Sequence, residues 1–144
     1  MKGYYKQPEL TRETIVDGWL RTGDIGRLDD EGNLFIVGRK KKIIVTGGEN
    51  VYPEEVEECL LEHEGVKEAA VVGKDDGVLG QVPVAFVAGR NGEKQTAELV
   101  RFCRKRLSSH KVPRAIEWFD ALPKTDTMKT DRRKLERMAQ EGRI

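Results

Sequence analysis

Residue types that could do chemistry are concentrated in one stretch of the sequence, residues 38–55. Three consecutive lysines at 40–42 run into an apolar triplet at 43–45, which indicates a charged turn that feeds a buried strand. Gly47 and Gly48 follow, and a double glycine allows positive φ angles or a close approach of the backbone to a ligand. The residues alone leave two interpretations open: a ligand-binding corner, or a strand–turn–helix joint beside a solvated lysine cluster.

Three further side chains carry groups that could do chemistry, but the residues alone favour a plain structural or solvated role for each of them. Asp24 stands between Gly23 and Gly26, which lets other groups come close to its carboxylate. The alternative for Asp24 is a turn carboxylate that bonds local backbone. Lys129 lies among other cations, which is typical of a solvated surface, and His63 lies near the expected end of a helix, where a histidine is more often a cap than a catalyst.

Composition limits the class of protein. The 144 residues suffice for one ordinary domain, or for one small domain with an appendage. The formal net charge of +1 gives no electrostatic drive toward nucleic acid or a membrane surface. The two cysteines and two histidines have no metal-ligand spacing, so we expect no metal site and cysteines buried as small apolar residues. No apolar run has membrane length and no signal peptide opens the sequence, so we expect a cytoplasmic protein without a membrane span.

The order of the expected elements predicts an α+β fold. A short helix and a β-hairpin are expected first, at 9–14 and 19–37, and they read as the tail of a larger domain. Hydrophobic periodicity then predicts strands at 66–72, 82–88 and 115–119 and helices at 54–63, 96–108 and from 131 onward. We therefore expect a small three-stranded sheet with helices and a short β-hairpin, preceded by a β-hairpin remnant of a larger domain.

Three motifs occur together in a fixed order, at residues 18–26, 38–57 and 122–129. Together they resemble the carboxyl-terminal portion of the adenylate-forming (ANL superfamily) acyl-CoA synthetases, a family that includes non-ribosomal peptide adenylation domains and beetle luciferases. The resemblance covers essentially the whole chain. Three ordered motifs at suitable spacing are far more specific than one.

The resemblance implies a function. The family uses ATP to convert a carboxylic acid into an acyl-adenylate, releases pyrophosphate, and then passes the acyl group to a thiol, commonly that of CoA. It implies that residues 1–40 are the terminal piece of the large amino-terminal domain and that residues 41–144 are the mobile carboxyl-terminal domain. ATP or AMP with Mg²⁺ and CoA are then expected in the complete enzyme, with none bound tightly to this chain alone, and the large domain is the expected partner.

The resemblance also implies roles for individual residues. Asp24 matches the carboxylate that accepts hydrogen bonds from both ribose hydroxyls, and Arg39 matches an arginine that contacts the nucleotide. Lys41 matches the hinge, where a few residues absorb a large change in φ and ψ. Lys129 matches the catalytic lysine of adenylation, which bridges the α-phosphate and the acyl carboxylate as negative charge builds.

A second group is implied to bind CoA, and its members are Gly47, Gly48, Glu49, His110, Lys111 and Arg114. The two glycines and Glu49 match a loop that meets the active site during thioester formation, where glycine lets backbone amides approach the pantetheine arm. His110 is expected to stack, and Lys111 or Arg114 to meet phosphate. The residues alone leave open a plain cationic cluster at the end of a helix.

Two positions depart from the family's pattern. Met128 precedes the matched lysine where the family usually has glycine, which restricts the loop. Leu79 stands where many relatives carry an aromatic residue, which weakens any assignment of adenine stacking by CoA.

The family's phosphate-binding loop, adenine pocket and acid pocket are absent from the sequence. We therefore expect an incomplete ligase that does not release pyrophosphate in response to an acid on its own, and the acid itself cannot be inferred. Two alternatives stay open: a piece of an adenylation domain that serves a carrier protein, or a stand-alone docking or regulatory module. A nucleic-acid-binding module is disfavoured, because the lysines have no interleaved aromatic residues.

Overall fold

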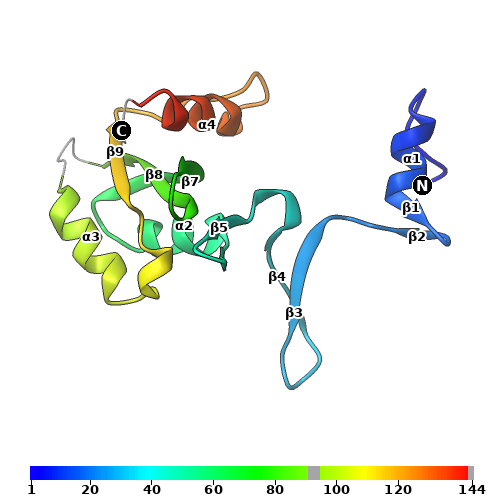
Figure 1. Ribbon diagram of the computed structural model, residues 1–144, viewed down its shortest axis with the longest axis horizontal. Helices are drawn as coiled ribbons and strands as arrows, with labels where there is room; N and C mark the ends of the chain where they lie inside the picture. The colour runs from blue at the N-terminus through cyan, green and yellow to red at the C-terminus, as the bar shows by residue number, and fades with distance from the viewer. Residues whose placement is uncertain (91–94, 143–144) are drawn as a thin grey trace. The chain divides into compact units, whose positions relative to one another are not determined.

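The computed structural model describes residues 1–90 and 95–142, except for the side chain of Lys41 (Figure 1). The chain divides into two compact units, Met1–Lys41 and Lys42–Ile144. We describe each unit by itself.

The first unit consists of short elements. They are α1 (Pro8–Thr14), β1 (Ile15–Val16), β2 (Trp19–Leu20), β3 (Asp24–Leu28) and β4 (Leu34–Arg39), followed at the boundary by the 3₁₀ turn η1 (Lys40–Lys42). Asp17 and Gly18 both have positive φ, 52° and 81°, so they form the tight two-residue turn between β1 and β2. The hairpin expected at 19–37 is the pair β3·β4, and it begins only at Asp24, because Gly23, with φ of 75°, separates β2 from β3.

The first unit has no buried apolar side chain among its described residues. Instead, large apolar side chains are exposed on it: Trp19 is 81% exposed, Leu28 65% and Ile36 62%. Its hairpin is held locally, since Asp29 Oδ1 accepts hydrogen bonds from the backbone N–H groups of Glu31 (3.0 Å) and Asn33 (2.8 Å) in the turn. This unit therefore does not bury a core of its own.

The second unit is built on one mixed sheet. Its elements are β5 (Ile44–Thr46), β6 (Glu49–Val51), α2 (Pro53–Leu61), β7 (Val66–Asp76), β8 (Gly80–Gly89), α3 (Thr96–Arg104), η2 (Ser109–Lys111), β9 (Ala115–Phe119) and α4 (Arg132–Gln140). The strands lie in the order β6-β5-β8-β7, and β9 also pairs with β8, on the side away from β7. The pair β8·β9 is parallel, because α3 carries the chain back between the two strands.

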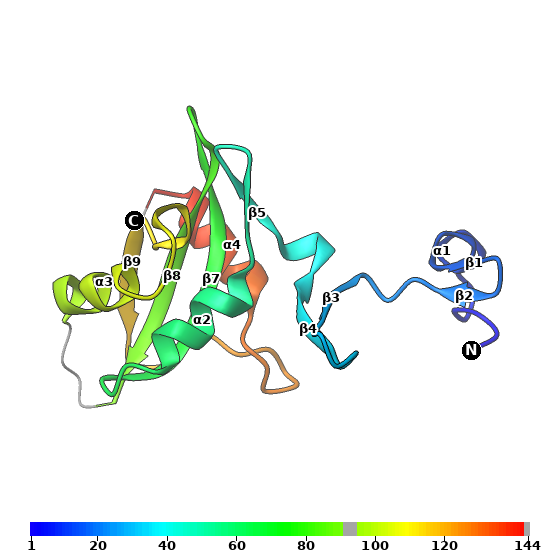
Figure 2. The same cartoon turned by 90° about the horizontal axis from the view of Figure 1, so that it is seen from below.

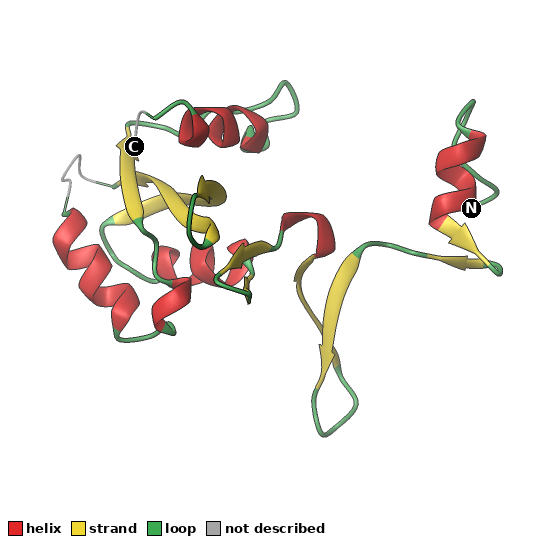
Figure 3. Cartoon of the chain, viewed as in Figure 1, coloured by secondary structure: helices red, strands yellow, loops and turns green. Residues whose placement is uncertain are grey.

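Helices cover both faces of this sheet (Figures 1 and 3). Alternate side chains of β7 point to opposite faces: Val71 joins the core formed with α2 and α3, and Ala70 and Val72 join the core formed with α4. Phe86 in β8 and Leu135 in α4 are fully buried in the second core. The expected α+β class is confirmed. The three expected strands are β7, β8 and β9, and the short hairpin β5–β6 joins them through the pair Thr46↔Gly80 to complete five strands.

The edge strand β7 would expose unpaired peptide groups if α4 did not cover it. Gln140, near the end of α4, meets two of them: its Oε1 accepts from the N–H of Asp75 (3.2 Å) and its Nε2 donates to the carbonyl of Gly73 (3.5 Å). The amide thus takes the place of a neighbouring strand. These contacts fix the carboxyl end of α4 against the sheet.

Candidate functional site

Asp24 and Arg39 form an ion pair in the first unit. They lie directly opposite each other in the β3·β4 ladder, and Arg39 Nε is 2.9 Å from Asp24 Oδ1. The Asp24 side chain is 24% exposed and that of Arg39 is 61% exposed. The structure therefore brings the two predicted nucleotide-binding residues together on a surface accessible to a ligand.

Gly47 and Gly48 form the two-residue turn between β5 and β6. Both have positive φ, 57° and 86°, which is the requirement of the tight hairpin turn that fits the twist of paired strands. The N–H of Gly47 donates to the carbonyl of Leu79 (2.8 Å), and a Cβ at position 47 would lie 3.4 Å from Leu79 Cδ2. Leu79 thus packs against the turn.

Glu49, His110 and Lys111 lie beside this turn. Glu49 Oε2 is 3.2 Å from His110 Nδ1, so the start of β6 contacts η2. Lys111 Nζ donates to both carboxylate oxygens of Glu55 at the start of α2, at 2.7 and 2.8 Å. Lys111 is therefore paired within the chain, and a phosphate would compete with Glu55 for its ammonium group.

Arg114 completes the group. Its N–H donates to the carbonyl of Pro83 (2.8 Å) and its side chain is exposed near the β7–β8 turn. There, the backbone N–H groups of Leu79 and Val78 lower the pKa of the Asp76 carboxyl, and the nearby charge of Arg114 lowers it further. We name as the sheet-end cluster the six residues that surround this end of the sheet: Gly47, Gly48, Glu49, His110, Lys111 and Arg114.

Lys129 lies in a tight hairpin between β9 and α4. Lys124 and Thr130 form an isolated β-bridge, and inside it the N–H of Thr125 donates to the carbonyl of Lys129 (2.8 Å). The N–H of Met128 donates to the carbonyl of Thr125 (2.9 Å), and Met128 has φ of 62°. This is a turn followed by a left-handed bulge residue, a position that favours glycine. The Lys129 side chain is exposed and has no ion pair among the described residues.

The two candidate sites of the second unit lie at opposite ends of β7. The base of the Lys129 hairpin contacts Glu68, near the start of the strand, and the sheet-end cluster adjoins the turn that follows Asp76. Eight residues of extended strand span about 26 Å. Figure 2 shows the orange loop before α4 and the turn between β7 and β8 at the two ends of the same strand.

The predicted hinge residue, Lys41, has its backbone in η1, where the division between the two compact units falls. Its side chain lies outside the described residues.

Two ion pairs near Lys129 were missed by sequence reasoning: Glu57–Arg132 and Glu68–Lys124. Burial raises the pKa of Glu57, and Arg132 opposes the increase. Arg132 is 75 positions from Glu57 in the sequence, so no local pattern links them. From the sequence, Glu57 is expected on the solvent-facing side of its helix, and only the tertiary structure shows that it pairs with Arg132.

The cysteines and His63 have structural roles, as expected. Cys59 and Cys103 are free and buried, and burial, with Cys59 beside it, raises the pKa of the Cys103 thiol to about 12. His63 Nδ1 accepts from the N–H of Gly65 (3.2 Å), which caps the turn after α2.

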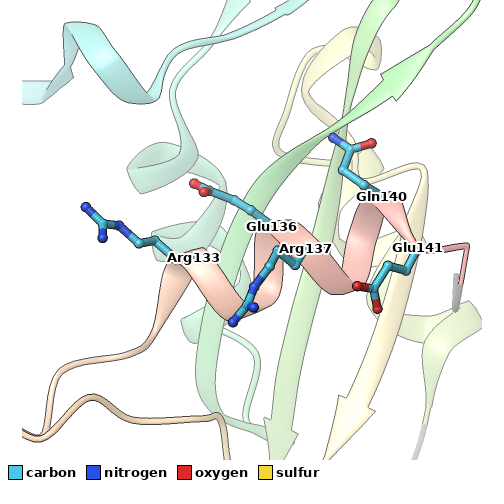
Figure 4. A pocket seen from close by; sticks show the side chains of 5 residues that line it. All are labelled: Arg133, Glu136, Arg137, Gln140 and Glu141. Atoms are coloured by element: carbon cyan, nitrogen blue, oxygen red, sulfur yellow. The ribbon is translucent and has the colours of Figure 1, made fainter.

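A shallow pocket lies on the outer surface of α4 (Figure 4). Its lining alternates in charge, with Arg133, Glu136, Arg137, Gln140 and Glu141, and Gln140 is already engaged by β7. Over residues 1–90 and 95–142, no group of three or more His, Cys, Asp or Glu side chains is placed to hold a metal ion. None of the helices in this described part is long and apolar enough to cross a membrane.

The second unit is thus an α+β body with the Lys129 hairpin at one end of its sheet and the Gly47–Gly48 turn at the other. The chain belongs to the family of AMP-binding enzyme C-terminal domains. The sequence model of that family matches residues 55–129, just over half of the chain. The implied membership in the adenylate-forming ligases is thereby confirmed, as their carboxyl-terminal portion.

Similar proteins are ligases of this kind. A 2-succinylbenzoate–CoA ligase of Bacillus cytotoxicus is 48% identical over 140 residues, which is 97% of this chain and 29% of the relative. The structure of o-succinylbenzoate CoA synthetase from Bacillus subtilis with its acyl-adenylate intermediate has a TM-score of 0.87 at 38% identity, covering 94% of this chain and 28% of that one. The amide bond synthetase McbA of Marinactinospora thermotolerans also has a TM-score of 0.87, at 37% identity, covering 95% of this chain and 28% of that one. The chain thus spans a little under a third of the proteins it matches.

Proposed function

We propose that the chain supplies the mobile carboxyl-terminal domain of an AMP-forming acyl-CoA ligase, and that it serves two half-reactions in turn. In the first, the carboxylate of an acid attacks the α-phosphorus of ATP and pyrophosphate leaves. In the second, the sulfur of CoA attacks the acyl carbonyl and AMP leaves. The observation that carries this proposal is the placement of the Lys129 hairpin and the sheet-end cluster at opposite ends of one strand, β7.

Lys129 is the residue we assign to adenylation. Its ammonium group is exposed and has no ion pair among the described residues, so its charge is available to a ligand. When the carboxylate attacks the α-phosphate, negative charge builds on the oxygens, and a positioned cation stabilises it. Removal of such a group typically lowers the rate by ~10²–10³.

The sheet-end cluster is assigned to the thiol step. Gly47 and Gly48 have no side chains, and their positive φ angles disfavour any other residue, so a pantetheine arm could run against the backbone of this turn. His110, Lys111 and Arg114 place cations and an aromatic ring beside the turn, as the phosphates and adenine of CoA require. When CoA binds, the ammonium group of Lys111 leaves the carboxylate of Glu55 and pairs with a phosphate of CoA instead.

The first unit is assigned to the large domain. It exposes apolar side chains such as Trp19, Leu28 and Ile36, and it buries none among its described residues. Such exposure suits a segment that completes the core of a larger domain. In that setting Asp24 receives the ribose hydroxyls and Arg39 a neighbouring part of the nucleotide, and the backbone at Lys41 is the pivot between the two domains.

The first acid to test is 2-succinylbenzoate, because the similar Bacillus cytotoxicus protein is a 2-succinylbenzoate–CoA ligase. Magnesium accompanies ATP in the proposed reaction, and its ligands are sought in the large domain. Free, buried cysteines suit the reducing cytoplasm, where we place the reaction.

The experiment replaces the matching C-terminal portion of the Bacillus cytotoxicus ligase with residues 1–144. Adenylation is measured as acid-dependent pyrophosphate release, and the thiol step as acyl-CoA formed from supplied acyl-adenylate. We expect both activities in the chimera and no pyrophosphate release from residues 1–144 alone. Lys129→Ala in the chimera is expected to lower adenylation by ~10²–10³ and to leave the thiol step within twofold.

Equal losses in the two steps would refute the role of Lys129. A folded chimera that binds ATP yet forms no adenylate would refute the proposed function. Transfer to a pantetheinylated carrier protein without transfer to CoA would instead identify the chain as part of an adenylation domain. Robust pyrophosphate release from residues 1–144 alone would contradict the need for a large domain.

A further inference from the structure

An ion pair closes the edge of the sheet just after the Lys129 hairpin. Arg132, the first residue of α4, donates to both carboxylate oxygens of Glu57 on α2, at 2.6 and 2.7 Å. The two helices lie on opposite faces of the sheet, so the pair reaches around the edge strand. It also meets the strand itself, because Glu57 Oε1 accepts from the N–H of Val71 (2.7 Å) and Arg132 donates to the Val71 carbonyl (3.0 Å). The pair therefore satisfies both the N–H and the carbonyl of one residue of β7, as a neighbouring strand would.

A second ion pair lies just before the hairpin. The ammonium group of Lys124 contacts the carboxylate of Glu68, also on β7, and reaches Thr130 Oγ1 at 3.4 Å. Lys124 and Thr130 are the bridged residues at the base of the hairpin. The second pair therefore joins the base of the hairpin to the same edge strand, three positions from Val71.

The two pairs bracket Lys129. Between them the hairpin has its own hydrogen bonds, and the N–H of Asp131 donates to the carbonyl of Pro123 (2.8 Å), which closes the segment between the two anchors. The two anchors differ in exposure: the Arg132 side chain is partly buried, with 24% exposed, whereas Lys124 is an exposed residue with 32% of its side chain accessible. Lys129 is the cation between them that has no acidic partner among the described residues.

We propose that Lys124 and Arg132 are positioning residues that hold the Lys129 hairpin on β7 and thereby fix the place from which Lys129 acts in adenylation. The proposal rests on the proposed function of Lys129. A reacting group that is displaced by about 1 Å loses ~10²-fold in rate. Without the ion pairs of Lys124 and Arg132, the hairpin could shift on the sheet and the ammonium group of Lys129 would not be held in one place. The anchors also pair Glu57 and Glu68 with other cations, so neither carboxylate competes for Lys129.

The kinetic test uses the chimera described above with Lys124→Met and Arg132→Met. Their matched controls are Lys134→Met and Arg133→Met, which remove exposed cations of α4 that have no ion pair among the described residues. We expect each anchor variant to lower kcat for adenylation at least tenfold, with the thiol step and the KM for ATP within twofold. The controls are expected to change neither step. Equal losses in both steps, or no loss in adenylation, would overturn the proposal.

Rescue separates positioning from charge. The exchange of partners, Lys124→Glu with Glu68→Lys, restores the pair with reversed charges and is expected to recover at least a third of the adenylation rate. Arg132→Met leaves a buried carboxylate without a partner, so Glu57→Gln with Arg132→Met is made beside it to keep the chain folded. A double variant at 57 and 132 that is folded and adenylates at the unaltered rate would remove Arg132 from the proposal.

A readout without catalysis keeps the two proposals apart. In residues 1–144 alone, Lys124→Met is expected to speed amide hydrogen exchange of Thr125 and Asp131 at least tenfold and to leave the β8 amides unchanged. Unchanged exchange at these two amides would overturn the anchor. If exchange rises as expected but Lys129→Ala does not affect adenylation, the anchor stands as a structural fact and the proposed role of Lys129 fails.

Discussion

At the scale of single residues, Met128 is the clearest local conflict in the chain. Its φ of 62° places a long side chain in the left-handed region, and its side chain is 78% exposed, so packing does not repay the cost. An L-residue in this region costs about 1–2 kcal/mol, and glycine regains part of that after its greater freedom in the unfolded chain is counted. We expect Met128→Gly to raise the free energy of unfolding by about 0.5–1 kcal/mol and Met128→Val to lower it, as measured by urea denaturation. Lower stability in Met128→Gly would contradict the left-handed bulge.

Cys103 sets a pH dependence at the same scale. Its pKa is raised to about 12 by burial, whereas a thiol in the unfolded chain ionises near pH 8.5. A raised folded-state pKa gives a contribution that is complete below pH 8.5 and is lost as the pH rises toward 12. Urea denaturation at pH 7 and pH 10 is expected to show about 1–2 kcal/mol less stability at the higher pH, and Cys103→Ala to remove that part of the loss. The same pH dependence in Cys103→Ala would show that other groups cause it.

At the scale of elements, the turn between β5 and β6 controls the sheet-end cluster. Gly48 has φ of 86° with open space where a Cβ would lie, so Gly48→Ala tests backbone strain alone. We expect it to cost the second unit about 1–2 kcal/mol and, in the chimera, to lower the thiol step more than adenylation. Gly32→Ala is the matched control, because Gly32 has φ of 83° and equally open space in the β3–β4 turn. A larger loss of adenylation in Gly48→Ala would contradict the assignment of this turn.

Comparison of the expected and observed helices and strands shows which parts of the fold the sequence predicts. Periodicity found α2, β7, β8, α3, β9 and α4, because each has an apolar face and local turn residues, although α3 ends at Arg104 and not at 108. It did not find that β7 runs on to Asp76, since the added residues are polar and depend on pairing with β8. The resemblance supplied the roles of Lys129 and of the sheet-end cluster, whereas the residues alone pointed only to the corner at Gly47 and Gly48. The pairs at Glu57 and Glu68 depend on a tertiary approach that a single sequence does not encode locally.

At the scale of the whole molecule, the two units differ in what they can do alone. Every buried apolar side chain among the described residues lies between Ile44 and Ala139, in the second unit. Burial of apolar surface within the second unit therefore stabilises it without help from the first. The first unit has exposed apolar side chains and local hydrogen bonds, so we propose that a partner surface is needed to order it. The division at Lys41 falls between a unit that buries a core and a unit that buries no apolar side chain among its described residues.

This difference predicts that residues 42–144 fold without the rest. The chain has two tryptophans, and only Trp118 remains after residues 1–41 are removed, so fluorescence then reports on the sheet alone. Trp118 packs against the core, and its Nε1 donates to Thr96 Oγ1 at 2.9 Å, which urea unfolding will break. We expect the urea midpoint of the Trp118 signal to be the same, within error, in residues 42–144 and in residues 1–144. Trp19, which is 81% exposed, is expected to show solvent-like emission in the longer chain before any urea is added. If residues 42–144 instead lose their cooperative transition, the first unit contributes to the core and the division at Lys41 is not a boundary between independent bodies.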